Sequence, residues 1–380
     1  MRILMTADTV GGVWTYALEL AGALSTRGVE VVLATLGDRP SPSQREAAQR
    51  VPGLQLRKGA FRLEWMDDPW DDVDRSSEWL LELEAEVRPD VVHLCSFSHG
   101  SLPWTAPSLL VAHSCVLSWW EAVRGEAAPA EWETYRRRVA AGLRGADLVA
   151  APTRAMLDAI TRLYGSFPEG VVLPNGRAPE AFSPRQKEPF VLSAGRLWDD
   201  AKNLSALAAV APKVGWPVHV AGSLEHPSGR TEPAAGVECL GRLEPPVLAE
   251  QLARAAIYAH PARYEPFGLA VLEAAYSGCA LVLGDIPSLR EVWGDAATFV
   301  RPDDSEALLA ALVRLIERPE ERARMALRAR ARAFDYTAEA MADRYVETYR
   351  RLSGRQGRGS RSAAQARKSG EPREVISCGS

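Results

Sequence analysis

The chain of 380 residues contains no apolar run of the roughly 20 residues that a membrane-spanning helix needs. Its five cysteines are scattered and include no CxxC pair, so neither a disulfide framework nor a zinc site is indicated. The formal net charge is only −4, and nothing in it points to a nucleic-acid partner. Because Met1–Thr6 is predicted as a strand rather than a signal peptide, we expect a cytoplasmic protein, and peripheral membrane contact stays open. We expect no bound metal.

Alternating strands and helices fill most of the sequence, which is long enough for two domains with separate cores. Uninterrupted apolar strands separated by helices predict parallel sheets that are covered on both faces. The first series of predicted strands comprises residues 2–6, 30–35, 90–95, 109–113 and 147–151, and a second series follows residues 171–174. That second series comprises residues 190–194, 217–221, 237–240, 256–260, 280–283 and 298–300. We therefore predict an α/β fold with two doubly wound domains.

The boundary between the two series lies at residues 173–187, which contain three prolines and one glycine and are predicted to form the hinge. We assign residues 1–172 to the first domain and 173–334 to the second. Residues 335–352 carry apolar side chains at helical spacing and predict a last amphipathic helix. From residue 353 to 380 the composition turns to Gly, Ser, Gln and Arg, which predicts a disordered tail.

One short motif follows the first strand of each series. Gly11 and Gly12 lie between a strand and a helix, where the backbone can approach a ligand closely and the helix N-terminus favours phosphate. Taken alone, this pair could equally be a tight turn. Arg196 and Lys202 follow the first strand of the second series, at the sheet edge where they could both reach one diphosphate and stabilise a departing nucleotide without a metal. Taken alone, they could be solvated surface cations.

The most specific motif is Glu-Pro-Phe-Gly-Leu-Ala-Val-Leu-Glu at residues 265–273. A loop at the start of a helix offers backbone N–H groups to phosphate, while Glu265 and Glu273 can accept hydrogen bonds from sugar and ribose hydroxyls. Paired carboxylates also occur in glycoside hydrolases, but the Arg/Lys pair argues against hydrolysis because a glycosidase has no phosphate to hold. The spacing GxGxxG of dinucleotide-binding oxidoreductases is absent.

At this point the residues resemble a known family. Residues 265–273 are similar to the E-P-F-G-L-x-x-x-E signature of retaining glycosyltransferases of group 1, family 4. The resemblance extends from Met1 to about Leu352, and it implies the GT-B architecture: two Rossmann-like domains that face an interdomain cleft. It also implies that the last helix crosses back to the first domain. The Leu-Pro-Asn-Gly segment at residues 173–176, which contains Asn175, is similar to a hinge-side segment of the family.

The resemblance implies a role for each matching residue. Glu265 would hold the donor sugar, Glu273 the ribose, and the amides of Phe267, Gly268 and Leu269 the sugar or phosphate. Arg196 and Lys202 would stabilise the leaving diphosphate, with Gly11, Gly12 and Asn175 also on the donor side. His113, at the end of a strand, would contact the sugar near the reacting carbon. The implied reaction retains the anomeric configuration by a front-face mechanism, without a cofactor or a protein nucleophile.

Seven of the 11 tryptophans fall between residues 65 and 132. Because aromatic faces stack on sugar rings, Trp119 and Trp120 are predicted to line the acceptor cleft, with core packing as the alternative. The donor is expected to be a UDP-sugar, with GDP- and ADP-sugars as alternatives, and the acceptor a carbohydrate or another hydroxyl compound. A sugar-nucleotide-binding scaffold without activity is the competing reading. The acceptor's identity and the oligomeric state are left undetermined.

Overall fold

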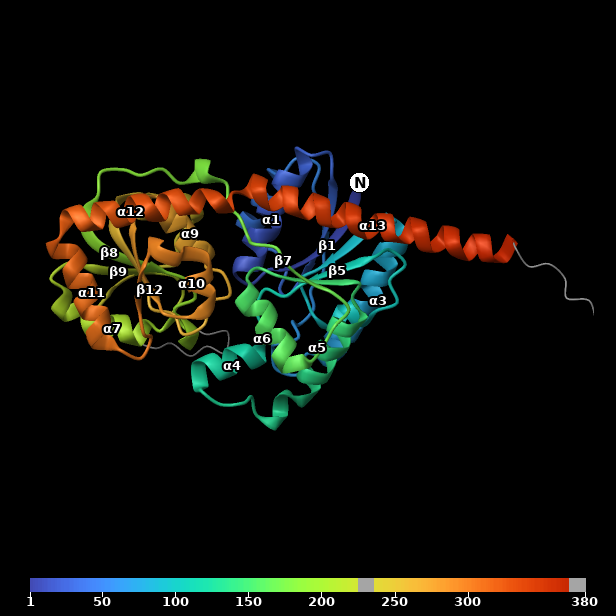
Figure 1. Cartoon of the computed structure of the whole chain (residues 1–380), viewed down its shortest axis with the longest axis horizontal. Helices are drawn as coiled ribbons and strands as arrows, with labels where there is room; N and C mark the ends of the chain where they lie inside the picture. Colours follow the sequence, from blue (N-terminus) through green and yellow to red (C-terminus); the bar gives the residue numbers. More distant parts are fainter. Residues whose placement is uncertain (225–235, 369–380) are drawn as a thin grey trace, which may run out of the picture.

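A computed structural model of the chain describes residues 1–224 and 236–368. Two α/β domains lie side by side and are joined by a linker and by a long C-terminal helix (Figure 1). Within these two ranges, no helix combines the length and the apolar character that crossing a bilayer demands.

The N-terminal domain contains a seven-stranded sheet in the order β3-β2-β1-β4-β5-β6-β7, with every neighbouring pair parallel. Its strands are β1 (Arg2–Asp8), β2 (Glu30–Leu36), β3 (Gln55–Lys58), β4 (Val91–Leu94), β5 (Ser108–Val111), β6 (Leu148–Ala151) and β7 (Gly170–Val172). Its helices are α1 (Gly12–Ser25), α2 (Pro42–Gln49), α3 (Trp70–Val87), α4 (Val116–Arg124), α5 (Glu133–Gly145) and α6 (Arg154–Tyr164). Short 3₁₀ turns occur at η1 (Ser98–Ser101) and η2 (Ala130–Trp132).

The C-terminal domain repeats this order in a six-stranded parallel sheet, β10-β9-β8-β11-β12-β13. Its strands are β8 (Glu188–Ala194), β9 (Val218–Ala221), β10 (Glu238–Gly241), β11 (Ala255–His260), β12 (Ala280–Gly284) and β13 (Thr298–Val300). The helices that follow are α7 (Leu204–Val214), α8 (Pro245–Arg254), α9 (Leu269–Tyr276), α10 (Pro287–Trp293), α11 (Ser305–Glu317), α12 (Pro319–Ala333) and α13 (Ala338–Lys368). The 3₁₀ turns here are η3 (Pro179–Ala181), η4 (Asp200–Lys202), η5 (Gly294–Ala296) and η6 (Phe334–Tyr336).

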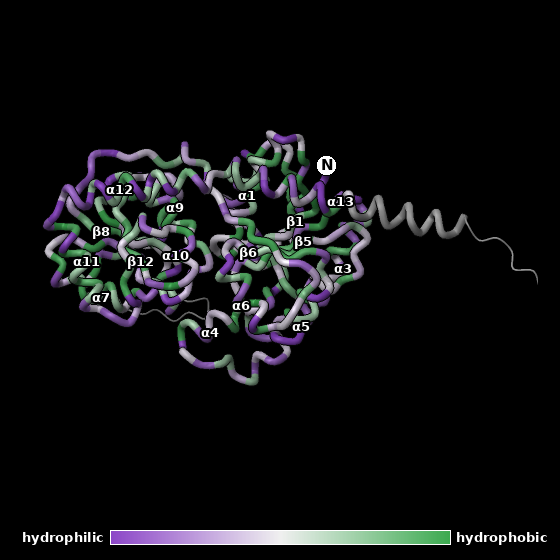
Figure 2. Tube along the Cα trace, in the orientation of Figure 1, coloured by the Kyte–Doolittle hydropathy of each residue, from purple (hydrophilic) through white to green (hydrophobic). Residues whose placement is uncertain are grey.

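The central strands are largely apolar and buried because helices cover both faces of each sheet. In β1 the five residues from Ile3 to Ala7 are all buried, and β11 is buried from end to end. Figure 2 shows the hydrophobic segments gathered in the sheets of both domains. The strand order reverses direction between β1 and β4 and between β8 and β11. In doubly wound sheets, ligands bind beside the carboxyl ends of the strands at such reversals.

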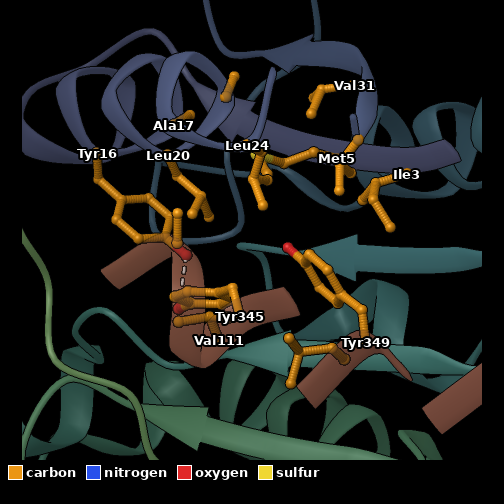
Figure 3. Packing of buried hydrophobic residues seen from close by; sticks show 14 of the residues in the cluster. Ile3, Met5, Tyr16, Ala17, Leu20, Leu24, Val31, Val111, Tyr345 and Tyr349 are labelled. Atoms are coloured by element: carbon orange, nitrogen blue, oxygen red, sulfur yellow. Dashed lines mark hydrogen bonds between the residues drawn. The ribbon is translucent and has the colours of Figure 1, made fainter. Parts of the chain in front are cut away.

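Helix α13 leaves the C-terminal domain and packs on the N-terminal one (Figure 1). Its buried residues Met341, Tyr345 and Tyr349 belong to the same apolar cluster as β1 and α1 (Figure 3). The Tyr16 hydroxyl donates to the Tyr345 hydroxyl at 2.6 Å, and His93 Nδ1 lies 2.6 Å from the Tyr349 hydroxyl. The C-terminal end of the chain therefore completes the core of the first domain.

The two connections between the domains are hydrogen-bonded to each other. Arg177 N donates to Tyr336 O at 3.1 Å, and Ala338 N donates to Arg177 O at 3.0 Å. The backbones come so close that a Cβ added to Gly176 would lie 2.2 Å from Thr337 O, which explains the glycine. The linker at residues 173–187 and the start of α13 thus form one double-stranded crossing.

Two features differ from the expectations. Strand β3 was not predicted, because this edge strand consists of Gln-Leu-Arg-Lys and has no buried residue to give it an apolar pattern. Helix α13 continues to Lys368, beyond the predicted end of the last helix at residue 352. Ala, Arg and Gln, which are common in residues 361–368, favour helix even where little apolar surface is available. Residues 369–380 of the expected tail lie outside the described residues.

Candidate active site

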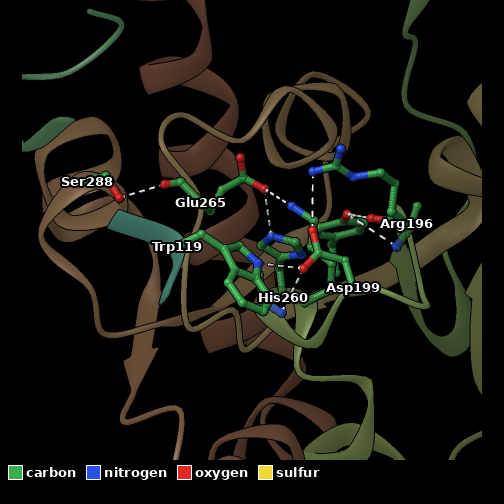
Figure 4. Close-up of polar contacts among 10 residues, drawn as sticks. Trp119, Arg196, Asp199, His260, Glu265 and Ser288 are labelled. Carbon is green, nitrogen blue, oxygen red and sulfur yellow. Dashed lines mark hydrogen bonds and ion pairs between the residues drawn. The ribbon is translucent and has the colours of Figure 1, made fainter. Parts of the chain in front are cut away.

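The ends of β8 and β11 bring the main site residues together in the C-terminal domain. Arg196 and Lys202 follow β8, and Glu265 lies in the loop between β11 and α9. Lys202 Nζ lies 2.7 Å from Glu265 Oε2, and His260 Nε2 lies 3.2 Å from the same oxygen (Figure 4). The Ser288 hydroxyl donates to Glu265 O at 2.6 Å and fixes the loop from α10. Sequence reasoning missed His260, although its place at the end of β11 was a usable signal.

The charge on Glu265 is held in place by its neighbours. Burial by itself raises the pKa of this carboxyl, but the Lys202 ammonium and the His260 hydrogen bond lower the pKa well below its ordinary value. Burial lowers the pKa of His260 although the carboxylate opposes this. At neutral pH the site therefore contains a carboxylate, an ammonium and a neutral imidazole that donates to the carboxylate.

Arg196 stands at the boundary between the domains. Its Nη2 donates to Asp199 Oδ2 at 3.2 Å, and its guanidinium lies above the ring of Trp198. A Cβ added to Gly11 would lie 3.7 Å from Arg196 Nη1, and one added to Gly12 would lie 3.8 Å from a methyl group of Leu269. Gly11 has a φ of +94°, a conformation that glycine adopts readily. The glycine loop of the first domain therefore faces the cation and the loop of the second.

The loop before α9 has the expected shape. Gly268 has a φ of +92° and immediately precedes the helix, whose first amides lack intrahelical acceptors. Phe267 is buried beneath it and its ring packs against Tyr336. The backbone amides at the start of α9 are therefore available to an anionic or hydroxylated ligand at the same sheet edge as Lys202.

Glu273 occupies a separate, buried charge cluster. Its Oε1 lies 2.9 Å from Arg177 Nε, and Arg177 also pairs with Glu19 of α1. Burial raises the pKa of Glu273, Arg177 lowers it and Glu19 raises it. This cluster joins α1, the linker and α9, so it ties both domains to the crossing. The sequence offered one signal for it, since Arg177 directly follows the Pro-Asn-Gly segment.

The other predicted donor-side residues lie in the N-terminal domain and the linker. The His113 ring is 4.3 Å from the Tyr16 ring, and its buried Nε2 has no hydrogen-bond partner among the residues that the structure describes. Burial lowers the pKa of His113 to about 3, so the imidazole is neutral. Asn175 is buried in the linker, and no described hydrogen bond reaches its Oδ1.

The two predicted acceptor residues lie on α4 at the domain boundary. Trp119 Nε1 donates to Asp199 Oδ1 at 2.9 Å (Figure 4). The Arg124 guanidinium lies over the Trp119 ring. Trp120 packs edge-on against Trp119, and its Nε1 is buried without a partner in the described parts of the chain. Trp119 thus contacts the C-terminal domain directly.

A small, partly open pocket, which the sequence did not predict, lies at the carboxyl ends of β1, β2 and β4. Its lining includes Asp8, Glu64, Ser96 and His99. Glu64 accepts hydrogen bonds from the Phe97 and Ser98 amides and from the Ser98 hydroxyl. Burial raises the pKa of Asp8 to about 6, although the Val10 amide and Arg196 lower it. Asp8 thus borders the pocket only three residues before Gly11.

The opposite side of the interface is fixed by Glu291. Its two carboxylate oxygens accept from the amides of Arg154 and Ala155, at 2.7 and 3.0 Å, and so cap α6 of the other domain. The Thr153 hydroxyl donates to Pro266 O at 3.0 Å.

Among residues 1–224 and 236–368, no group of three or more His, Cys, Asp or Glu side chains is arranged to hold a metal ion.

Comparison with known proteins agrees with this geometry. The profile described as "Glycosyl transferases group 1" matches residues 177–332, and that of "Glycosyltransferase Family 4" matches residues 10–180. A D-inositol 3-phosphate glycosyltransferase of Thermomonospora curvata is 26% identical, over 89% of this chain and 90% of its own. A glycogen synthase of Mycobacterium tuberculosis is 28% identical over 91% and 94%.

Solved structures share the fold. A sucrose-phosphate synthase of Thermosynechococcus elongatus superposes with a TM-score of 0.76 at 19% identity, covering 93% of this chain and 99% of that one. The Anabaena protein HepE, solved in complex with UDP-glucose, gives a TM-score of 0.72 at 18% identity, covering 93% and 100%. The two domains therefore have the GT-B architecture.

Proposed function

We propose, because the chain belongs to the group 1 glycosyltransferases of family 4, that it moves a sugar from a nucleotide-diphosphate donor to an acceptor hydroxyl with retention of configuration. The observation that carries the proposal is the cluster of Arg196, Lys202 and Glu265 opposite the Gly11 loop. Two cations beside a hydroxyl-binding carboxylate suit a sugar diphosphate and have no evident use in a glycosidase.

The ion pairs of the site indicate what the donor would replace. Lys202 is paired with Glu265 and Arg196 with Asp199, so each cation already has a carboxylate partner. A diphosphate bound between the cations would draw Lys202 from Glu265 and leave Glu265 free to accept from sugar hydroxyls. The two positive charges would then stabilise the negative charge that develops on the leaving phosphate.

In the proposed reaction the bond between the anomeric carbon and the phosphate oxygen breaks, and the acceptor oxygen bonds to the same face of that carbon. The acceptor proton passes to the departing phosphate oxygen, so no protein nucleophile takes part. The neutral His113 imidazole would contact the sugar near this carbon. Its buried Nε2 has no hydrogen-bond partner among the described residues, which supports such a contact. The leaving-group charge would be met by Arg196 and Lys202, so the proposed step does not require a metal.

The pocket beside Asp8 is the proposed acceptor site. Asp8, three residues before Gly11, lines this pocket, and its carboxylate is suited to accept from an acceptor hydroxyl. A UDP-sugar is the proposed donor, with GDP- and ADP-sugars as alternatives; the UDP-glucose complex of HepE supports UDP. Carbohydrate, lipid-linked and small-molecule acceptors all have the hydroxyl that the reaction needs.

The test is a thermal-unfolding screen of the whole chain against UDP-, GDP- and ADP-sugars, followed by NMR of the product anomer. A donor at 100 times its Kd should add about 2.7 kcal/mol to the free energy of unfolding. We expect Arg196→Ala to abolish this gain, whereas Arg301→Ala, which removes an exposed arginine of the same domain, should keep it. Failure of every donor to stabilise the protein or to be turned over would refute the proposal, and an inverted product would refute retention.

A further inference from the structure

Asp199 joins three groups from both domains on one buried carboxylate. Its side chain is only 5% exposed. One oxygen, Oδ1, accepts from the indole of Trp119 at 2.9 Å and from the Ala201 amide at 3.0 Å, while Oδ2 accepts from Arg196 at 3.2 Å (Figure 4). Trp119 belongs to α4 of the N-terminal domain, whereas the other partners belong to the C-terminal domain.

This arrangement goes beyond capping the 3₁₀ turn η4. The Ala201 amide needs only one oxygen, yet the second oxygen is directed to Arg196 and the first is shared with the other domain. Indole has a single N–H, and Trp119 uses it on this carboxylate. Arg196 itself has the Gly11 backbone on one side. The position of its guanidinium therefore depends on the N-terminal domain in two ways: directly through Gly11, and through Trp119, which holds Asp199.

We propose that Asp199 is a positioning residue that holds Arg196 for the donor diphosphate, and that Trp119 fixes Asp199 only when the two domains are in contact. The inference rests on the proposed function, because the diphosphate is what gives the position of Arg196 its importance. It assigns Trp119 a role in assembling the donor site in place of acceptor stacking.

Two polar contacts join α4 to residues 199–200, and the Trp119 bond is the shielded one of the two. Arg124 pairs with Asp200 at 2.8 Å, but both side chains are nearly half exposed, so water and salt screen the pair. The Trp119 bond ends on a carboxylate that is shielded from water, where a hydrogen bond to a charge is strongest. Closing the domains thus adds a directional contact to the carboxylate that orients Arg196.

The test compares Trp119→Phe with Trp132→Phe in the full chain, using donor and acceptor kinetics. Phenylalanine keeps an aromatic face but removes the N–H, so a stacking role would largely survive and the bond to Asp199 would not. Trp132 is the matched control because its buried N–H has no acceptor among the described residues and it lies outside the proposed site. We expect Trp119→Phe to lower kcat about tenfold with an unchanged acceptor KM, and Trp132→Phe to stay within about twofold.

Asp199→Asn supplies the second arm, since its amide oxygen can still accept from Trp119 while the charge facing Arg196 is lost. We expect a higher donor KM and lower kcat, and we expect the double variant with Trp119→Phe to be no slower than Asp199→Asn alone. Additive losses, a raised acceptor KM in Trp119→Phe, or equal kinetics of the two tryptophan variants would overturn the inference while leaving the proposed function intact. A wild-type protein that turns over no donor would instead refute the proposed function and, with it, this role of Arg196.

Discussion

Replacing Lys202 by methionine should destabilise the protein through the carboxylate that it leaves behind. The side chains of Lys202 and Glu265 are 15% and 16% exposed, so the pair is largely shielded from water. Breaking a buried pair by removing one partner costs about 3–5 kcal/mol, because the remaining charge is left without compensation. The hydrogen bond from His260 to Glu265 stays, so we expect a loss of about 3 kcal/mol, at the lower end of that range. At about 2–4 °C per kcal/mol for domains of this size, the midpoint of thermal unfolding should fall by about 6–12 °C.

The loss should depend on pH with a definite sign. In the wild type the pKa of Glu265 is lower in the folded than in the unfolded protein, so its ionisation stabilises the fold above the unfolded pKa, and this contribution is lost only as the pH falls through the folded pKa. Without Lys202, burial dominates and the folded pKa rises, so ionisation then opposes folding. The difference between the two proteins should be largest at pH 7 and shrink toward pH 4.5.

The assay is thermal unfolding of four proteins at pH 7 and pH 4.5: wild type, Lys202→Met, Glu265→Gln and the double variant. Glutamine removes the charge, so the double variant should recover most of the stability lost in Lys202→Met. Lys213→Met, at an exposed lysine in the last turn of α7, should change the stability by less than about 0.5 kcal/mol. A double variant as unstable as Lys202→Met, or a loss that is the same at both pH values, would refute the reasoning.

Two further predictions concern the pocket and the crossing. The acceptor kcat/KM should rise with pH through about 6, the pKa of Asp8, because the ionised carboxylate accepts from the acceptor hydroxyl. Asp8→Asn should remove this inflection. It should also raise the unfolding temperature at pH 8, since ionisation of Asp8 opposes folding. Persistence of the inflection in Asp8→Asn would assign it to another group. Gly176→Ala should cost about 2 kcal/mol because the new Cβ meets Thr337 O, whereas Gly22→Ala, with open space around it on α1, should be neutral or stabilising; equal unfolding temperatures for the two variants would contradict the close-approach argument.

The fold could be predicted largely from its strands. Buried parallel strands such as β1 and β11 are continuous apolar runs, and these runs revealed both sheets. The edge strand β3 escaped because three of its four side chains are polar and none is buried. The continuation of α13 to Lys368 escaped for a related reason, since apolar periodicity ends at Leu352 while backbone helix formation does not.

The site could be predicted where a residue lies at a strand end and not where it depends on a distant partner. Arg196, Lys202 and Glu265 follow strands of one sheet, so their meeting follows from topology. Asp199 and Arg177 act through Trp119 and Glu19, which lie 80 and 158 residues away in the sequence. No local pattern encodes such pairs. The role of Trp119 was for this reason predicted from its aromatic face alone, without the bond that its indole makes.

The crossing of α13 also has a consequence for the order in which the protein is completed during synthesis. Tyr345 and Tyr349 fill the core beside β1 and α1, so β1 leaves the ribosome long before the helix that closes its core has been made. The N-terminal sheet must then persist with an open apolar face while about two hundred further residues are translated, which takes roughly 10–40 s at ordinary elongation rates. The apolar face is sealed by α13 only after the second domain has been translated.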